Sequence, residues 1–423
     1  MTDDMSAGPG AGAVQIDPEV LERYLMELAA FGAWGETGVS RLVYSPAWQA
    51  AQQQIMAWGA TLGCETRMDA SGNVWCRLVG SEDGSSVATG SHVDSQDPGG
   101  RYDGALGVVA GLTALQALVA QHGRPRRTIE LVSFAEEESS RFASAQFLGT
   151  RGITGAITPA DADAMIGYDG VTLADAMRAA GLDPARIPEA QRQPGEIDTF
   201  IELHIEQGPI LEQSGYAVGI VDAITGLRHT VVELTGRSDH AGARPMDTRL
   251  DPMAGAAEII SGLINHAVAL GRPAVTTVGR MFVEPNLTAA VPDRVQFTID
   301  ARHPDPAQRL ALYAHHDALV ARVAEERGLG LQMETVAAHE PRLSDPGVVA
   351  LLEATASDLG MAVLRMQSGA VHDTQRMARI AKVAMIFVQS RDGRSHTPEE
   401  FTSLEHAAAG TQVLANALYR LAY

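Results

Sequence analysis

The order of expected strands and helices changes in the middle of this chain, and that change limits the possible folds more than any other feature. Before about residue 221 and again after 335, short β-rich runs alternate with helical apolar spacing. Such alternation is typical of an α/β sandwich built on a largely parallel sheet. Between 222 and 334 the order is instead β-α-β-β-α-β, as in ferredoxin-like domains. The sequence therefore predicts a two-domain α/β fold in which one domain is inserted into the other.

This division predicts four segments. Residues 1–16 are rich in glycine and alanine and are expected to be disordered, whereas 17–221 form the first part of the main domain. Residues 222–334 form the inserted domain, and 335–423 complete the main domain. With 423 residues and 45% hydrophobic content, the chain is long enough for two hydrophobic cores.

Composition excludes several classes of partner. The formal net charge is -20 with only 20% charged residues, so nucleic acid is not an expected partner. Cys64 and Cys76 are the only cysteines, too few for a disulfide framework, and a reducing compartment such as the cytoplasm is expected. The acidic, Gly/Ala-rich beginning is unlike a signal peptide, and no membrane association is expected.

A polar segment follows an apolar strand of the first α/β part. His92 and Asp94 stand two residues apart in GSHVDS, and Asp103 lies in the Gly-rich loop that opens the next helix. Because residues two apart point the same way on a strand, Asp94 could orient the His92 ring instead of binding an ion itself. Taken alone, this HxD triplet is equally typical of an ordinary polar loop at a strand end.

Three more strand ends carry histidines or carboxylates. The strand TIELVSF runs into three glutamates at 136–138, His204 ends another strand, and His396 lies in a polar loop after the apolar strand at 383–388. Three adjacent carboxylates repel one another and usually mark a solvated loop, but a nearby dication would stabilise them. Open α/β sheets place their sites at the carboxyl ends of strands, so these side chains are expected to converge.

The converging residues suit metal ions. Imidazole and carboxylate are ligands that borderline divalent ions accept, and one carboxylate can bridge two of them. Water held by such ions has a lowered pKa, and a neighbouring carboxylate can take its proton as it attacks a carbonyl. The sequence therefore predicts a hydrolytic centre with two divalent ions, built from His92, Asp103, Glu138, His204 and His396.

These motifs, with others in the same order, resemble the amidase/hydantoinase/carbamoylase family. The resemblance begins at about residue 20, covers nearly the whole chain, and rests on GSHVDS, GGRYDGALGV, AEEESSRF, ELHIEQGP, DHAGARPMDTRLDP, TIDARHPD, SGAVHD and GRSHTPEE. It implies a peptidase-like catalytic domain with two metal ions and an inserted lid and dimerisation domain. It also implies hydrolysis of the carbamoyl (ureido) C–N bond of a small carboxylate such as allantoate, an N-carbamoyl-L-amino acid, ureidoglycolate or N-carbamoyl-β-alanine.

Carried over residue by residue, the resemblance assigns two ion sites that share one carboxylate. His92, Asp103 and His204 would hold one ion, and Asp103, Glu138 and His396 would hold the other. Mn, Zn, Co and Ni all accept such ligands, so the sequence leaves the metal open.

The resemblance also assigns residues that act on the water and the substrate. Glu137 would be the general base for a water between the ions, and Asp94 would bind neither ion directly. His240, in the inserted domain, would polarise the scissile carbonyl in the partner subunit of a homodimer, and Arg302 would grip the substrate carboxylate. Without the resemblance, this pair is typical of an ordinary loop histidine and an exposed strand arginine. Further substrate contacts would come from Gln207 and His372.

Four positions depart from the family pattern. Ala289 stands where the family commonly has a substrate-contacting asparagine, Ser139 and Val371 each replace a glycine, and Arg394 replaces an isoleucine. None of them is an expected ion ligand or the expected base. Hydrolysis is therefore expected, while the exact substrate stays open.

Two other functions compete with this interpretation. An aminoacylase or dipeptidase on the same fold would cleave an ordinary amide, but peptidase relatives tend to have an acidic ligand where this chain has His204. A non-catalytic binding protein would have lost an ion ligand or Glu137, and all of these are present. We therefore expect an enzyme for a small ureido-carboxylate, as in the breakdown of purine-derived ureides.

Overall fold

The chain divides into two compact units in the computed structural model, which describes residues 13–423. The first unit runs to Asp222 and resumes over Ser344–Met366 and His372–Tyr423. The second comprises Ala223–Leu343 and the short segment Gln367–Val371. This second unit therefore ends later than position 334, where the sequence pattern placed its boundary, and it also takes in a short returning segment.

Of the segment 1–16, which the sequence analysis expects to be disordered, the structure describes only residues 13–16. Residues 1–12 lie outside the described residues. Within the described part, Val14 is fully buried, and its backbone N–H donates to Asn416 Oδ1 at 2.9 Å. Residues 13–16 therefore pack against the last helix instead of standing free of the fold.

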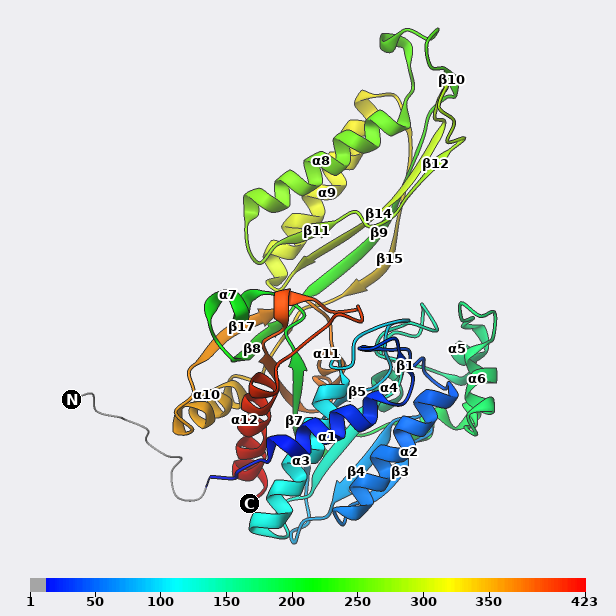
Figure 1. The fold of residues 1–423 in the computed structure, drawn as a ribbon. Helices are drawn as coiled ribbons and strands as arrows, with labels where there is room; N and C mark the ends of the chain where they lie inside the picture. The colour runs from blue at the N-terminus through cyan, green and yellow to red at the C-terminus, as the bar shows by residue number, and fades with distance from the viewer. Residues whose placement is uncertain (1–12) are drawn as a thin grey trace, which may run out of the picture. The chain divides into compact units, whose positions relative to one another are not determined.

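A nine-stranded sheet forms the centre of the first unit (Figure 1). Its middle strands β6, β5, β7 and β18 are parallel, whereas β4, β3 and β8 beside them pair antiparallel. The parallel part is smaller than the sequence suggests, because a connection as short as that between β3 and β4 permits only antiparallel pairing. The strands are β3 (Glu65–Met68), β4 (Val74–Leu78), β5 (Ser86–His92), β6 (Ile129–Phe134), β7 (Ile197–Ile205), β8 (Val218–Ile224), β16 (Arg342–Leu343), β17 (Val363–Ser368) and β18 (Lys382–Val388).

Helices cover both faces of this sheet. Alternate strand residues, such as Val87 and Ala88, belong to different apolar clusters, as the period of two requires. One cluster joins the sheet to α1 (Pro18–Ala29), α2 (Pro46–Thr61), α3 (Ala105–His122), α10 (Pro346–Asp358) and α12 (Leu404–Ala422). The other joins it to α4 (Leu148–Ile153) and α11 (Thr374–Met377). The expected α/β/α sandwich is confirmed.

Smaller elements complete the first unit. They are the hairpin β1 (Ala33–Trp34) and β2 (Gly38–Val39), the helices α5 (Pro159–Ala164), α6 (Leu173–Ala179) and α7 (Ile210–Ser214), and the 3-10 turns η1 (Pro184–Ala190) and η3 (Arg391–Gly393).

Five of the longer helices begin in the same way. An Asp or Ser side chain at the N-cap accepts a backbone N–H of the first turn, and a proline follows at the first helical position. The proline removes an N–H that has no intrahelical partner, so the pair stabilises the helix start. The capping residues are Asp17, Ser45, Asp251, Asp305 and Asp345.

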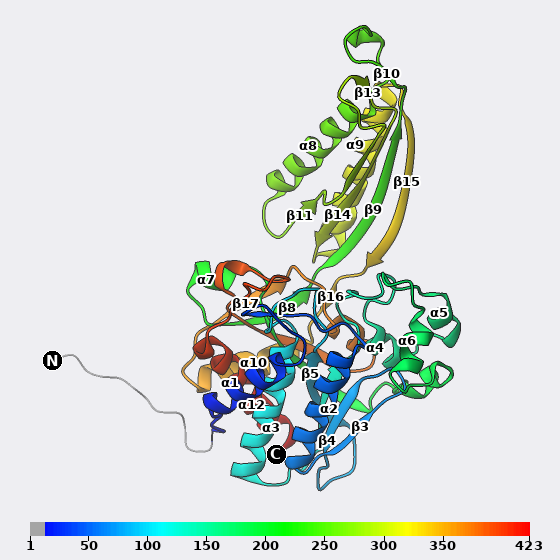
Figure 2. The same cartoon turned by 45° about the vertical axis from the view of Figure 1, so that its right-hand side comes forward.

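The second unit has the β-α-β-β-α-β order that the sequence predicts (Figure 2). Its five-stranded antiparallel sheet has the order β11-β14-β9-β15, with β12 also beside β14. Along β14, Val295, Phe297 and Ile299 are buried against α8 and α9, while the residues between them lie on the sheet's other face. The elements are β9 (Gly226–Thr235), β10 (Asp239–His240), η2 (Met246–Thr248), α8 (Pro252–Leu270), β11 (Val275–Thr277), β12 (Met281–Glu284), β13 (Ala290–Val291), β14 (Arg294–His303), α9 (Pro306–Glu326) and β15 (Gly330–His339).

Two helices of the described chain are long and apolar enough to cross a membrane by length and composition alone. Of the apolar 18-residue stretch in α3, 72% is buried, which is typical of a core helix in a folded domain. Of the apolar 18-residue stretch in α8, only 28% is buried, so this helix keeps an apolar surface that the second unit does not cover.

A glycine in β5 sets the distance between the two strands that lead into the expected site. Gly90 has a φ of 149°, and a Cβ there would lie 1.9 Å from the carbonyl oxygen of Val132 on β6. Any side chain at this position would have to push the strands apart two residues before His92.

Gly90→Ala is therefore expected to lower the free energy of unfolding of the first unit by about 3 kcal/mol, from backbone strain and overpacking together. Urea unfolding followed by tryptophan fluorescence measures this unit, because all four tryptophans lie in it. Gly84→Ala is the control, since Gly84 belongs to the same unit, has a φ of 141°, and would place a Cβ that meets nothing within 4 Å. A Gly90 variant as stable as that control would contradict the steric account.

Candidate active site

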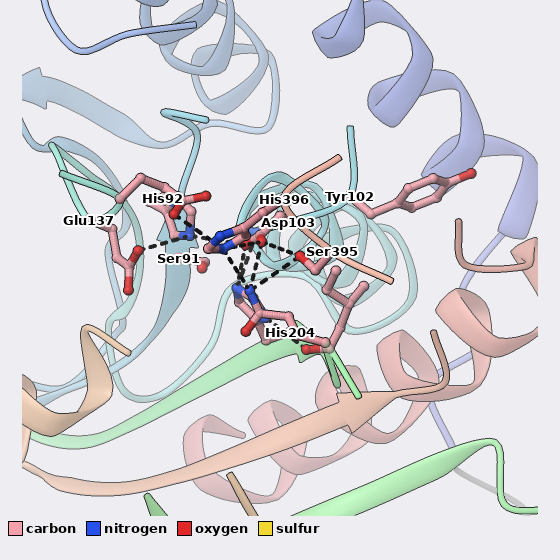
Figure 3. A network of polar contacts seen from close by, with 12 residues as sticks. Ser91, His92, Tyr102, Asp103, Glu137, His204, Ser395 and His396 are labelled. Atoms are coloured by element: carbon pink, nitrogen blue, oxygen red, sulfur yellow. Dashed lines mark hydrogen bonds and ion pairs between the residues drawn. The ribbon is translucent and has the colours of Figure 1, made fainter. Parts of the chain in front are cut away.

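The carboxyl ends of the four parallel strands meet at one edge of the sheet, and the predicted residues lie there. His92 is the last residue of β5, and His204 is the last but one of β7. The glutamates at 136–138 follow β6, and His396 lies in the loop after β18. Figure 3 shows the three histidine rings gathered around Asp103, which precedes α3. The expected convergence of strand ends therefore occurs.

Asp103 lies between two sets of side chains and faces each with a different oxygen. Its Oδ1 is 3.5 Å from His92 Nε2 and 3.1 Å from His204 Nε2. Its Oδ2 is 3.5 Å from His396 Nε2, and that nitrogen is 3.4 Å from Glu138 Oε2. A carboxylate shared in this way is the arrangement that a bridging ligand requires.

Backbone carbonyls fix the tautomers of the two buried histidines. The Nδ1 atoms of His92 and His204 lie 3.0 and 2.9 Å from the carbonyl oxygens of Asp94 and Ile205. A carbonyl can only accept, so each Nδ1 carries the proton and each Nε2 of the neutral ring presents a lone pair. The backbone N–H of Gly104 points at His204 Nε2 from 3.2 Å. Both rings are therefore held in the form that binds a metal ion.

Asp94 lies beside His92, but its main chain provides the closer contact. Its side-chain Oδ1 is 3.7 Å from His92 Nδ1, while its backbone carbonyl accepts from that nitrogen at 3.0 Å. Its Oδ2 accepts the backbone N–H of Glu138 at 3.0 Å. Asp94 therefore links the loop after β5 to the loop after β6.

Two residues that the sequence analysis did not single out hold Asp103 in place. Ser395 Oγ lies 2.7 Å from Asp103 Oδ2 and 2.8 Å from Glu400 Oε2. Glu400 Oε1 accepts the backbone N–H groups of Tyr102 and Asp103 at 2.9 and 3.0 Å. The only available signal was the TPEE motif, which reads as an exposed polar turn until the fold buries Glu400.

Gln207 also contacts the shared carboxylate. Its Nε2 donates to Asp103 Oδ2 at 2.7 Å and lies 3.4 Å from His396 Nε2. Gln207, His396 and Glu136 all have positive φ values, between 50° and 58°. Such strained backbone in non-glycine residues is characteristic of functional sites.

The donor set fits two divalent ions. In the described part of the chain, His92, Asp103 and His204 form one group whose ligand atoms lie within 4.8 Å of one another, and Asp103, Glu138 and His396 form a second. Three imidazoles and two carboxylates are ligands that Mn, Zn, Co and Ni share. These are the two sets that the sequence predicts.

The ligand atoms of a third group also lie within 4.8 Å of one another, but the hydrogen bonds of its carboxylate set this group apart. It consists of Glu202, His204 and His372. Glu202 Oε1 accepts from Ser91 Oγ at 2.7 Å and its Oε2 from Thr374 Oγ1 at 2.5 Å. Because each of its oxygens already accepts a hydrogen bond from a hydroxyl group, this buried carboxylate links neighbouring segments of the site.

The expected base lies beside the first group. Glu137 Oε2 is 3.8 Å from His92 Nε2, and Glu137 belongs to neither ligand group. Burial, together with the neighbouring carboxylates of Glu138 and Asp373, raises the pKa of Glu137 well above its usual value. A carboxylate with a raised pKa is a stronger base, and this one lies within reach of the space beside the ligands.

The other ionisable groups shift as a buried acidic cluster requires. Burial raises the pKa of Glu138 to about 7, and Asp103 adds to this effect while His396 opposes it. Burial alone would raise the pKa of Asp103, but the hydrogen-bonding His204 and His92 hold it well below its usual value. Burial alone would lower the pKa of His92, but Glu137 and Asp103 raise it well above normal. Cations at this site therefore relieve an unfavourable concentration of negative charge.

His372 is buried directly behind His204, with the ring centroids 4.7 Å apart. Burial and the neighbouring His204 keep its pKa well below the usual value for histidine. His372 has 2% of its surface exposed, and the substrate contact expected from the sequence stays a prediction.

The remaining predicted residues belong to the second unit. His240 is exposed on β10, and its Nδ1 accepts the backbone N–H groups of Gly242 and Ala243 at 3.0 and 3.1 Å. The ring proton of neutral His240 must therefore be on Nε2. Arg302, on β14, is partly exposed. Ala289 lies beside His240, because its carbonyl accepts the N–H of Ala241 at 2.9 Å.

Comparison with known proteins connects this geometry with a family. Residues 88–420 match the model of peptidase family M20/M25/M40. The chain is 38% identical to an allantoate amidohydrolase from Bacillus subtilis, covering 95% of this chain and 97% of that one. It is 37% identical to an N-carbamoyl-L-amino acid amidohydrolase from Geobacillus stearothermophilus, covering 96% and 99%.

A solved structure agrees with these matches. The amidase of the hydantoinase/carbamoylase family from Burkholderia multivorans superimposes with a TM-score of 0.88 at 34% identity, covering 96% of this chain and 98% of that one. The chain therefore belongs to peptidase family M20/M25/M40 and is a hydrolase of its amidase/hydantoinase/carbamoylase branch.

Proposed function

We propose that this enzyme hydrolyses the carbamoyl (ureido) C–N bond of a small carboxylate, such as allantoate or an N-carbamoyl-L-amino acid. The observation that supports this most is the pair of ligand groups sharing Asp103, with Glu137 beside them. Relatives that act on allantoate and on N-carbamoyl-L-amino acids, each matched over nearly the whole chain, support the substrate class. The expected cytoplasmic location is part of the proposal, and it agrees with the free, buried cysteines Cys64 and Cys76.

Five side chains would hold two divalent ions. They are His92, Asp103 and His204 for one ion, and Asp103, Glu138 and His396 for the other. Bound there, the ions would supply Lewis acidity, which polarises a carbonyl and lowers the pKa of water. Gln207 and Ser395 keep the shared carboxylate oriented by donating to its Oδ2.

Glu137 would move the proton. Its carboxylate would accept a proton from the water at Oε2 as that water attacks the carbonyl carbon, and would return the proton to the leaving nitrogen as the C–N bond breaks. Ureido hydrolysis then yields an amine and carbamate, and the carbamate decomposes to ammonia and carbon dioxide. Ammonia release is therefore the direct readout of the proposed reaction.

The second unit would supply the substrate contacts. With the proton on Nε2, His240 offers a neutral N–H donor of the kind that stabilises a developing oxyanion. Arg302 would bind the substrate carboxylate. We propose, as the family resemblance implies, that the second units pair in a homodimer and that His240 serves the partner subunit's site. Only 28% of the apolar 18-residue stretch of α8 is buried in the single chain, and this exposure supports such a pairing.

A substrate panel tests the proposed function. After loading with Mn or Zn, ammonia release is measured with allantoate, ureidoglycolate, N-carbamoyl-L-amino acids and N-carbamoyl-β-alanine. N-acetyl amino acids and dipeptides are measured in parallel by release of the free amino acid. Turnover of ureido compounds alone is expected. Turnover confined to N-acyl compounds or dipeptides would instead identify an aminoacylase or dipeptidase.

Glu137→Gln is expected to reduce turnover at least about a thousandfold while leaving the metal content unchanged, because it removes a proton acceptor and no ligand. His204→Ala should instead lose bound metal, since it removes an imidazole from the first group. Elemental analysis beside the ammonia assay distinguishes the two. The matched control is Glu82→Gln, which changes an exposed carboxylate that belongs to neither ligand group. Normal turnover in the Glu137 variant would reject its role as base.

Mixed dimers test where His240 acts. His240→Ala and Glu137→Gln subunits should each be inactive as homodimers. After the two are unfolded and refolded together, about half of the dimers are mixed, and each mixed dimer has one site with both residues intact. About a quarter of wild-type activity should therefore return. If mass spectrometry detects mixed dimers that remain inactive, His240 does not serve the partner's site.

A further inference from the structure

Arg302 is held by a carboxylate on its own strand. Asp300 and Arg302 are two residues apart on β14, so their side chains lie on the same face, opposite to α8 and α9. Asp300 Oδ1 accepts from Arg302 Nε at 2.9 Å, and Asp300 Oδ2 accepts from Nη2 at 2.8 Å. The guanidinium is therefore gripped along one edge by two charge-assisted hydrogen bonds.

Two further contacts complete the arrangement. His229, directly opposite Asp300 on β9, has its Nε2 2.8 Å from Asp300 Oδ2. Arg302 Nη1 donates to the carbonyl oxygen of Gly369 at 3.0 Å. Asp300 is therefore fixed from one side by His229, and Arg302 is fixed from two sides.

This arrangement leaves Arg302 with unused donors. A guanidinium has five N–H groups, and Asp300 and Gly369 together take three of them. The two that remain are on Nη1 and Nη2 and have no partner among the described residues. A guanidinium can donate from both of these nitrogens to an anion, so Arg302 keeps donors for a carboxylate ligand.

A second arginine–carboxylate pair on the same sheet differs from Arg302 and Asp300 in its number of carboxylates. Glu233 and Arg294 also form an arginine–carboxylate pair on the same face of β9 and β14, at 2.6 Å. There Arg294 donates in addition to Glu284, so that guanidinium is shared between two carboxylates. Arg302 has one carboxylate and one neutral carbonyl as partners, so its positive charge is offset by one carboxylate where that of Arg294 is offset by two.

We propose that Asp300, anchored by His229, is a positioning residue that holds Arg302 ready for the substrate carboxylate. This inference rests on the proposed function, in which Arg302 binds that carboxylate. A free arginine side chain loses rotamer freedom when it binds, and holding it beforehand removes a cost equivalent to about two- to tenfold in affinity. The negative charge of Asp300 acts in the opposite direction by repelling the substrate carboxylate. Removing that charge should raise KM if positioning dominates and lower KM if repulsion dominates.

A double-mutant cycle tests the proposal. Asp300→Asn keeps the side-chain size but leaves only one acceptor oxygen and turns an NH2 group toward the guanidinium. KM and kcat are measured for Asp300→Asn, Arg302→Ala and the double variant, with an N-carbamoyl-L-amino acid and with its uncharged carboxamide. Glu233→Gln is the matched control, because it removes a carboxylate from the other arginine pair on this face.

Asp300→Asn is expected to raise KM for the acid about two- to tenfold, with kcat and the carboxamide unaffected. In the Arg302→Ala background the same substitution should have no further effect, because a residue that acts only through Arg302 cannot act once it is gone. Additive effects, equal effects on acid and carboxamide, or an unchanged or lower KM for the acid would each overturn the proposal.

A crystal structure of the Asp300→Asn variant provides a readout that does not depend on activity. The Arg302 guanidinium should lose its single position and its contact with Gly369, while Arg294 keeps its own. An Arg302 that stays in place would overturn the proposal even if the enzyme turned over none of the panel. If Arg302→Ala treats acid and carboxamide alike, the carboxylate-binding role in the proposed function fails and this inference fails with it. No ureido turnover in the wild type, with a displaced Arg302 in the variant, would reject the proposed substrate while supporting the positioning.

Discussion

Repulsion among buried carboxylates at one edge of the sheet is the constraint on which the rest of this site depends. Asp94, Asp103, Glu136 and Glu137 are buried, and the side chain of Glu138 is nearly so. Burial, and after it the interaction of these carboxylates with one another, raises the pKa values of the three glutamates. Such a cluster is stable when cations neutralise it, and the surrounding imidazoles are the ligands that place divalent cations there.

The fold meets this constraint with separate elements instead of one local motif. Four parallel strands each end at the same edge, so their ends contribute ligands from widely separated parts of the chain. Backbone carbonyls set the tautomers of His92 and His204, and Glu400 holds the Asp103 loop by two of its backbone N–H groups. The tautomers and positions of the proposed ligands therefore depend on hydrogen bonds made by residues outside the two ligand groups.

In the second unit too, hydrogen bonds from neighbouring residues orient the side chains that are expected to contact the substrate. An antiparallel sheet with helices on one face leaves its other face for polar side chains, and alternation along β14 places Asp300 and Arg302 there together. At the other end of this unit, two backbone N–H groups fix the proton of His240 on Nε2. In both places a partly exposed side chain is oriented by its neighbours before any ligand arrives, which lowers the entropy lost on binding.

The sequence by itself determined the fold class and the order of elements, and it predicted the residues that meet in both proposed ligand groups, because periodicity, capping residues and dense local motifs are properties of short segments. Only the tertiary structure revealed the roles of Ser395, Glu400 and Glu202, because each acts on a residue about a hundred or more positions away. It likewise decided that the Asp94 carbonyl, more than its carboxylate, orients His92, and that His372 packs behind His204. Contacts between distant segments depend on how strands and loops meet, and a short sequence pattern does not contain that information.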